Sequence, residues 1–141
     1  MTMAPAHLDA AATAMALELL SRGEDVTLRA RGASMWPFLL DGDVVTLTPC
    51  GRRPPRMGEV VLLRQGDFGL IHRVVAVVPA PGWPCQPRFA VKGDALPRLD
   101  GWFAPERLPA RVARVRRGTE TFVPLRALPL ALSYLRGLDG R

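Results

Sequence analysis

The chain has 141 residues and a formal charge of +6, from 19 basic and 13 acidic residues. Its length predicts one domain, large enough to fold without disulfides or a structural metal. Hydrophobic residues make up 48% and charged residues 23% of the chain, which excludes an intrinsically disordered protein. Two His and two Cys are too few for a Cys/His zinc site, so we expect no metal or cofactor. Cys50 and Cys85 are expected to be free thiols.

The basic residues are unusual because 18 are Arg and only Lys92 is Lys, while Asn is absent. We interpret this as a compositional bias and not as the signature of a nucleic-acid-binding protein. The arginines are scattered apart from a group at Arg52, Arg53 and Arg56 and a run over 111–117. That run alternates Arg with Val, which predicts a half-buried strand. Nucleic acid is therefore not an expected partner.

The first 25 residues predict one helix, over residues 7–21, which Gly23 ends. Asp9 and Glu18 interrupt its apolar stretch, so it does not fit a signal peptide. No window has the ~18 uncharged apolar residues of a membrane-spanning helix. We therefore expect a cytoplasmic protein, with peripheral recruitment to a membrane by a partner left open.

From residue 26 onward, short apolar and β-branched runs are separated by Gly and Pro, which is typical of strands. The predicted strands are Val26–Arg31, Val44–Thr48, Val60–Leu63, Leu70–Val78, Phe89–Val91 and Arg111–Arg117. They predict a mainly β fold, a small coiled sheet or barrel with an N-terminal helix. The predicted organisation is a helix and lead-in over 1–25, a domain over 26–118 and a C-terminal tail over 119–141.

One serine, Ser34, is a candidate nucleophile. Ser34 follows Gly32 on a bend after a strand. Such a bend can expose a hydroxyl and leave backbone N–H groups free to hold an oxyanion. A Ser hydroxyl needs a base to take its proton, and the candidates are His72, His7 and Lys92. His72 is preferred because histidine ordinarily titrates near pH 6.5, whereas His7 lies in the predicted terminal helix.

A histidine base usually has a carboxylate that fixes its tautomer and stabilises the imidazolium. Asp94 and Asp100 follow His72, and we take Asp94 first and Asp100 as the second choice. Taken singly, a Ser in a turn and a His in a strand are more often structural. Their occurrence together, in this order, indicates a Ser–His–Asp site.

Four motifs carry a resemblance to a known family. They are Ser34-Met35-Trp36-Pro37, Gly42-Asp43-Val44-Val45, His72-Arg73-Val74-Val75, and Lys92-Gly93-Asp94 followed by Asp100. Their order resembles the signal peptidase and LexA-like superfamily of serine peptidases over residues 26–118. His72 stands where the bacterial branch has a Lys, so the chain looks closest to the archaeal and eukaryotic-like branch.

The resemblance implies a β-rich peptidase fold and an endopeptidase that cleaves peptides or proteins. Ser34 is then the nucleophile and its backbone N–H an oxyanion donor, with Gly32, Met35, Trp36 and Pro37 forming the substrate and oxyanion region. The expected substrate is a leader or signal-like peptide within a maturation system. Two alternatives remain: a LexA-like protein that cleaves itself, and a catalytically silent binding module whose Arg52–Arg56 loop holds an acidic partner.

Overall fold

The computed structural model describes residues 7–79, 86–126, 129 and 131–132. Within them the sequence prediction of a mainly β fold with an N-terminal helix is confirmed. The strands form one antiparallel sheet that does not close into a barrel, so of the two predicted forms the open sheet is observed. The elements are β1 His7–Leu8, α1 Ala10–Ser21, β2 Val26–Arg29, β3 Val44–Pro49, β4 Val60–Gln65, β5 Phe68–Pro79, β6 Pro87–Lys92, β7 Gly101–Phe103, a 3-10 turn at Pro105–Arg107, β8 Ala110–Arg117 and β9 Glu120–Phe122.

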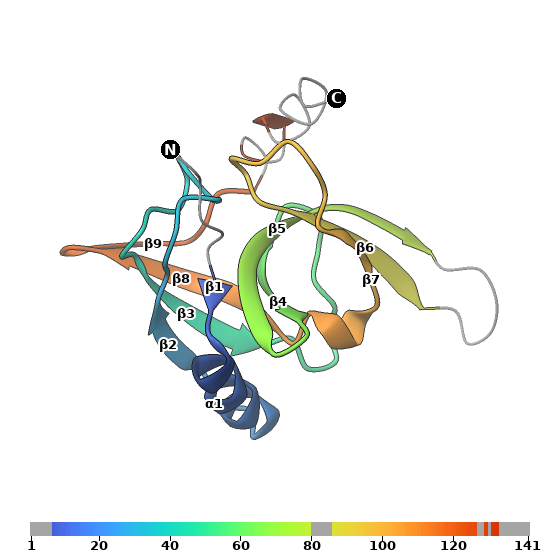
Figure 1. The fold of residues 1–141 in the computed structure, drawn as a ribbon, viewed down its shortest axis with the longest axis horizontal. Coiled ribbons are helices and arrows are strands. Elements are labelled where there is room, and N and C mark those ends of the chain that lie inside the picture. Colours follow the sequence, from blue (N-terminus) through green and yellow to red (C-terminus); the bar gives the residue numbers. More distant parts are fainter. Residues whose placement is uncertain (1–6, 80–85, 127–128, 130, 133–141) are drawn as a thin grey trace.

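The strand order is β2-β3-β8-β4-β5-β6-β7, with β1 paired to β5 and β9 paired to β8. β8, late in the sequence, lies between β3 and β4, so the chain returns to the middle of the sheet after building both ends. Figure 1 shows β2, β3 and β8 together on one side of the molecule and β6 and β7 on the other. β1 and β9 lie outside residues 26–118, so the sheet extends beyond these bounds at both ends.

Helix α1 begins three residues later than predicted because Asp9 caps it. The Asp9 carboxylate accepts a hydrogen bond from the Ala12 N–H at 2.8 Å, which satisfies an amide that has no partner within the helix. The helix ends as expected before Gly23, whose positive φ of 81° suits a glycine. His7 belongs to β1 and is exposed.

The sheet encloses two apolar clusters. The larger packs α1 against β2, β3 and β8, and it includes Met35 and Leu39 from the β2–β3 connection. The smaller joins residues of β4, β5, β6 and β7 and includes Phe89 and Phe103. Because Met35 and Leu39 are 1% and 3% exposed, the loop that carries Ser34 is anchored in the main core.

Cys50 is a buried free thiol at the end of the β3 region, as expected. Burial raises the pKa of this thiol above its ordinary value. Cys85 lies outside the described residues, as does much of the predicted tail over 119–141.

In the part of the chain that the structure describes, no helix combines the length and the apolar character needed to cross a membrane.

Candidate active site

The structure brings Ser34 and His72 together from positions 38 residues apart. Ser34 lies in the β2–β3 connection and His72 in β5. The Ser34 Oγ and His72 Nε2 atoms are 2.9 Å apart, which is hydrogen-bond distance. The two residues are 0% and 1% exposed. The nucleophile and base inferred from the sequence therefore form a direct, buried contact.

Asp100 is the carboxylate that faces this histidine. Its Oδ2 lies 2.6 Å from His72 Nδ1, and its own backbone N–H donates to the Val91 carbonyl at 2.7 Å. A neutral histidine that donates from Nδ1 to a carboxylate has an unprotonated Nε2, which can accept a hydrogen bond from the Ser34 hydroxyl. Ser34, His72 and Asp100 thus form a continuous hydrogen-bonded chain.

The first choice for this role, Asp94, faces Arg73 in the structure, whereas Asp100 faces His72. Both carboxylate oxygens of Asp94 accept hydrogen bonds from Arg73, at 2.8 Å from Nε and 2.7 Å from Nη2. The two side chains are each 1% exposed. Asp94 therefore neutralises a buried guanidinium, a cation that would be costly to leave unpaired.

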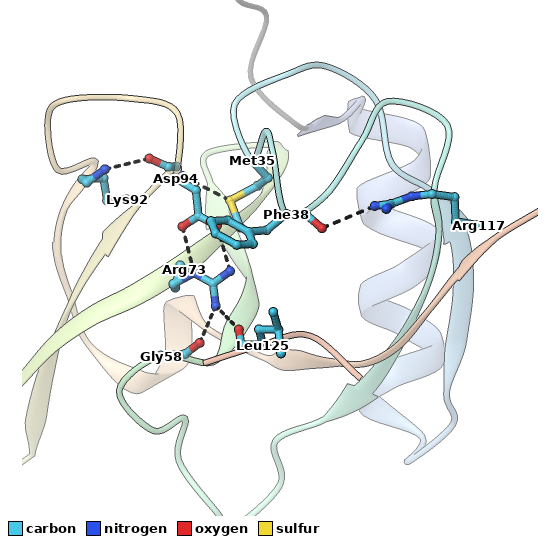
Figure 2. Close-up of polar contacts among 9 residues, drawn as sticks. Met35, Phe38, Gly58, Arg73, Lys92, Asp94, Arg117 and Leu125 are labelled. Carbon is cyan, nitrogen blue, oxygen red and sulfur yellow. Dashed lines mark hydrogen bonds and ion pairs between the residues drawn. The ribbon is translucent and has the colours of Figure 1, made fainter. Parts of the chain in front are cut away.

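Arg73 joins three segments around the site, as Figure 2 shows. Its Nη1 donates to the carbonyls of Gly58 and Leu125, each at 2.7 Å, and its guanidinium lies 5.9 Å from the centre of the Phe38 ring. The sequence motif His72-Arg73-Val74-Val75 includes this residue, but the sequence did not predict that Arg73 connects these segments through hydrogen bonds.

The Lys92-Gly93-Asp94 motif places a turn against Ser34. Lys92 Nζ donates to the Gly93 carbonyl at 3.0 Å and to the Leu96 carbonyl, and the Ala95 N–H donates to the Ser34 carbonyl at 2.8 Å. Lys92 was the alternative base, and the preferred base, His72, places its Nε2 2.9 Å from Ser34 Oγ.

Gly93 is required in this turn by space. A Cβ atom there would lie 2.9 Å from the Ser34 carbonyl oxygen and 3.2 Å from His72 Nε2. Because a Cβ cannot lie 2.9 Å from a backbone oxygen without a shift of the chain, only glycine lets the turn approach the Ser–His pair this closely.

The predicted substrate and oxyanion residues around Ser34 differ in their burial and contacts. Gly32 has a φ of 94°, which permits the predicted bend, and its N–H donates to Asp41 Oδ1 at 2.7 Å. Met35 is buried, and its sulfur accepts from the Asp94 N–H at 3.4 Å. Trp36 is 52% exposed and precedes Pro37 through a cis peptide bond. Of the predicted substrate region, Met35 is thus core, and Trp36 reaches solvent.

Asp43 holds the end of the Ser34 loop in place. The Gly42-Asp43-Val44-Val45 motif includes this residue, but the sequence did not predict this role. The Asp43 carboxylate accepts from Arg117 at 2.9 and 2.7 Å and from the Leu40 N–H at 2.9 Å. Burial acts to raise the pKa of Asp43, but these hydrogen bonds and the Arg117 charge outweigh it and hold the pKa below its ordinary value. Arg117 also donates to the Phe38 carbonyl (Figure 2).

Comparison with protein-family models, curated proteins and solved structures gives no match. The family resemblance therefore depends on the motifs of this chain alone. Among the described residues, no cluster of three or more His, Cys, Asp or Glu side chains is placed to hold a metal ion.

Proposed function

We propose that this protein is a serine endopeptidase in which Ser34 is the nucleophile, His72 the general base and Asp100 the carboxylate that orients His72. The observation that carries the proposal is the hydrogen-bonded chain of 2.9 Å and 2.6 Å through the two nitrogens of His72. A serine, histidine and carboxylate in this order act as a catalytic unit on unrelated folds. Here the three residues come from separate parts of the chain.

In the proposed reaction Ser34 Oγ attacks the scissile carbonyl while its proton passes to His72 Nε2. His72 then donates that proton to the leaving amine, and Asp100 stabilises the transient imidazolium. Water, deprotonated by His72, hydrolyses the resulting ester at Ser34 and restores the enzyme. The Ser34 N–H is the proposed oxyanion donor.

The burial of the pair has a consequence for substrate entry. Because Ser34 is 0% exposed, a peptide carbonyl reaches Oγ only after neighbouring atoms move aside. An extended peptide or a protein loop therefore has to displace residues around Ser34 before it can be cleaved. We expect small acylating reagents to react faster than bulky ones at this serine.

The proposed substrate is a leader or signal-like peptide. A pocket of about 360 Å³ adjoins the loop that follows Ser34. Apolar residues and three charged residues line it: Pro37, Phe38, Leu39, Phe122, Pro124 and Leu125, with Arg73, Arg117 and Glu120. A pocket of this kind suits the apolar side chains of such a peptide. Self-cleavage and silent binding remain the alternatives.

The test is cleavage of candidate leader peptides, with new termini identified by mass spectrometry. Wild-type protein is compared with Ser34→Ala, His72→Ala and the matched control Ser21→Ala, which removes an exposed hydroxyl at the end of α1. The proposal expects cleavage by wild type and Ser21→Ala alone. Equal cleavage by all four proteins would exclude the site, and loss in Lys92→Ala with full activity in His72→Ala would transfer the base role to Lys92.

A further inference from the structure

One face of the sheet gathers arginines that are far apart in the sequence. In the strand register Arg29 of β2 lies opposite Val44 of β3, and Val44 lies opposite Arg116 of β8. Thr121 of β9 lies opposite Arg116. Directly opposed residues of antiparallel strands point to the same face. Arg29 and Arg116 therefore flank Val44 on one face.

The next row of the same face adds a third arginine. Thr27 lies opposite Thr46, with their hydroxyl oxygens 3.4 Å apart, and Thr46 lies opposite Arg114. Arg29, Arg114 and Arg116 are all exposed. We call the surface formed by Thr27, Arg29, Val44, Thr46, Arg114, Arg116 and Thr121 the basic face.

The basic face looks away from the main core. The alternate residues of the same strands, including Val45, Leu47 and Val115, are 0% exposed and pack in the cluster that includes α1 residues. The residues of the basic face are polar apart from Val44, so this side of the sheet can face solvent without a covering helix. The face is therefore an open surface formed by four strands.

The charges on this face are not balanced within it. None of the described strand residues that share the face is Asp or Glu, and within the described part of the chain no ion pair involves Arg29, Arg114 or Arg116. One donor of Arg29 contacts the Gly42 carbonyl at 2.9 Å. Along a strand, alternate residues are ~7 Å apart, so Arg114 and Arg116 repel each other. By contrast, Arg73, Arg111 and Arg117 each pair with a carboxylate.

We propose that the basic face is a docking surface for an acidic polypeptide segment of a protein partner. Guanidinium groups bind carboxylates through paired N–H donors, and the threonine hydroxyls supply further hydrogen bonds. The face has no aromatic side chain on which the bases of single-stranded nucleic acid would stack. It also lacks the cluster of apolar side chains with which a surface helix or loop inserts into a membrane.

The basic face lies next to the loop that carries Ser34 but contains none of the candidate active-site residues. Arg29 is the last residue of β2 and Val44 the first of β3, so both flank the loop that carries Ser34. A partner held here lies beside that loop. The binding itself requires no cleavage, so it stands or fails independently of the proposed peptidase activity.

The test is a fluorescence-anisotropy titration with a labelled oligo-glutamate peptide at low ionic strength. The triple variant Arg29→Gln/Arg114→Gln/Arg116→Gln is compared with wild type. The control is Arg64→Gln/Arg88→Gln/Arg98→Gln, which removes the same charge from exposed arginines elsewhere. Removing three charge pairs is expected to weaken binding about tenfold, with a much smaller loss in the control. Circular dichroism verifies that both variants fold.

Equal weakening in the two triple variants would overturn the proposal, because net charge alone would then explain the binding. A labelled oligothymidylate and vesicles of phosphatidylcholine with phosphatidylserine are titrated in parallel. If either binds more tightly than the peptide and loses affinity only in the Arg29/Arg114/Arg116 variant, the proposed class of partner is wrong.

Discussion

Replacing Asp100 with Asn tests the orientation of His72 while leaving the shape of the side chain almost unchanged. An Asn that directs its NH₂ group toward Nδ1 forces the histidine proton onto Nε2. The Ser34 hydroxyl then meets a donor where it needs an acceptor. The variant is therefore expected to fold and to bind peptide, but to lose the chemical step.

The size of the loss follows from the geometry. The carboxylate lies 2.6 Å from His72 Nδ1 with its side chain only 15% exposed. At an effective dielectric constant near 20, a carboxylate and an imidazolium at this distance attract by ~6 kcal/mol. Since ~1.4 kcal/mol corresponds to tenfold in rate, we expect kcat to fall by roughly 10⁴-fold.

Asp94→Asn is the matched comparison, because it makes the same change six residues away (100 − 94). It removes the charge partner of Arg73, whose side chain is 1% exposed. Leaving that cation unpaired is expected to lower the free energy of unfolding by ~3–5 kcal/mol. Peptide cleavage kinetics and urea unfolding, measured on both variants, separate the two roles.

A reversed pattern would refute the roles assigned to the two carboxylates. If Asp94→Asn remained as stable as wild type and lost activity, while Asp100→Asn kept its activity, Asp94 would be the carboxylate that serves His72. The buried Arg73 pair would then have no structural role of the kind inferred here.

Two further variants test the surroundings of the site. Gly93→Ala places a Cβ 2.9 Å from the Ser34 carbonyl oxygen and 3.2 Å from the His72 ring, and we expect cleavage to fall by ~10²-fold. Gly69→Ala, equally crowded but against an apolar side chain, should lose stability and keep its activity per folded molecule; equal activity losses would contradict the role of Gly93. Asp43→Asn should lower the free energy of unfolding at pH 7 by ~1–2 kcal/mol, a charge-assisted hydrogen-bond loss discounted for the partly exposed arginine partner. The pKa of Asp43 is lowered in the folded protein, so its contribution to stability is complete above the ordinary pKa of ~3.9 and is lost as the pH falls through the lowered value. The urea unfolding curves of wild type and Asp43→Asn should therefore converge in acid. A constant difference at all pH values would contradict this.

The longer strands could be predicted from the sequence because their patterns are local. Val60–Leu63 and Leu70–Val78 stand out as apolar runs between glycines, and they correspond to β4 and β5. β1 and β7, with two and three residues, are too short to show alternation. Their pairing depends on neighbours that only the fold supplies.

The candidate site could be predicted only in part. Ser34 and His72 were recognisable from their motifs, but the choice between Asp94 and Asp100 depends on how the turn after β6 folds. Lys92 lies opposite Arg73 in the β5–β6 register, and Asp94, two residues further on, reaches Arg73. Similarly, the Arg–Val alternation of β8 predicted a half-buried strand but not its proximity to Arg29, because β8 pairs with β3 across a long sequence separation.

Labelling with a small fluorophosphonate, followed by peptide mass mapping, tests the proposed nucleophile most directly, since it needs no knowledge of the substrate. We predict one phosphonyl group per chain on Ser34 in wild type and in Ser21→Ala, and none on Ser34→Ala. Labelling of His72→Ala should be strongly slowed, because the base that takes the hydroxyl proton is gone. An unlabelled Ser34 in folded wild-type protein, or equal labelling rates with and without His72, would contradict the assignment of Ser34 and His72 as nucleophile and base.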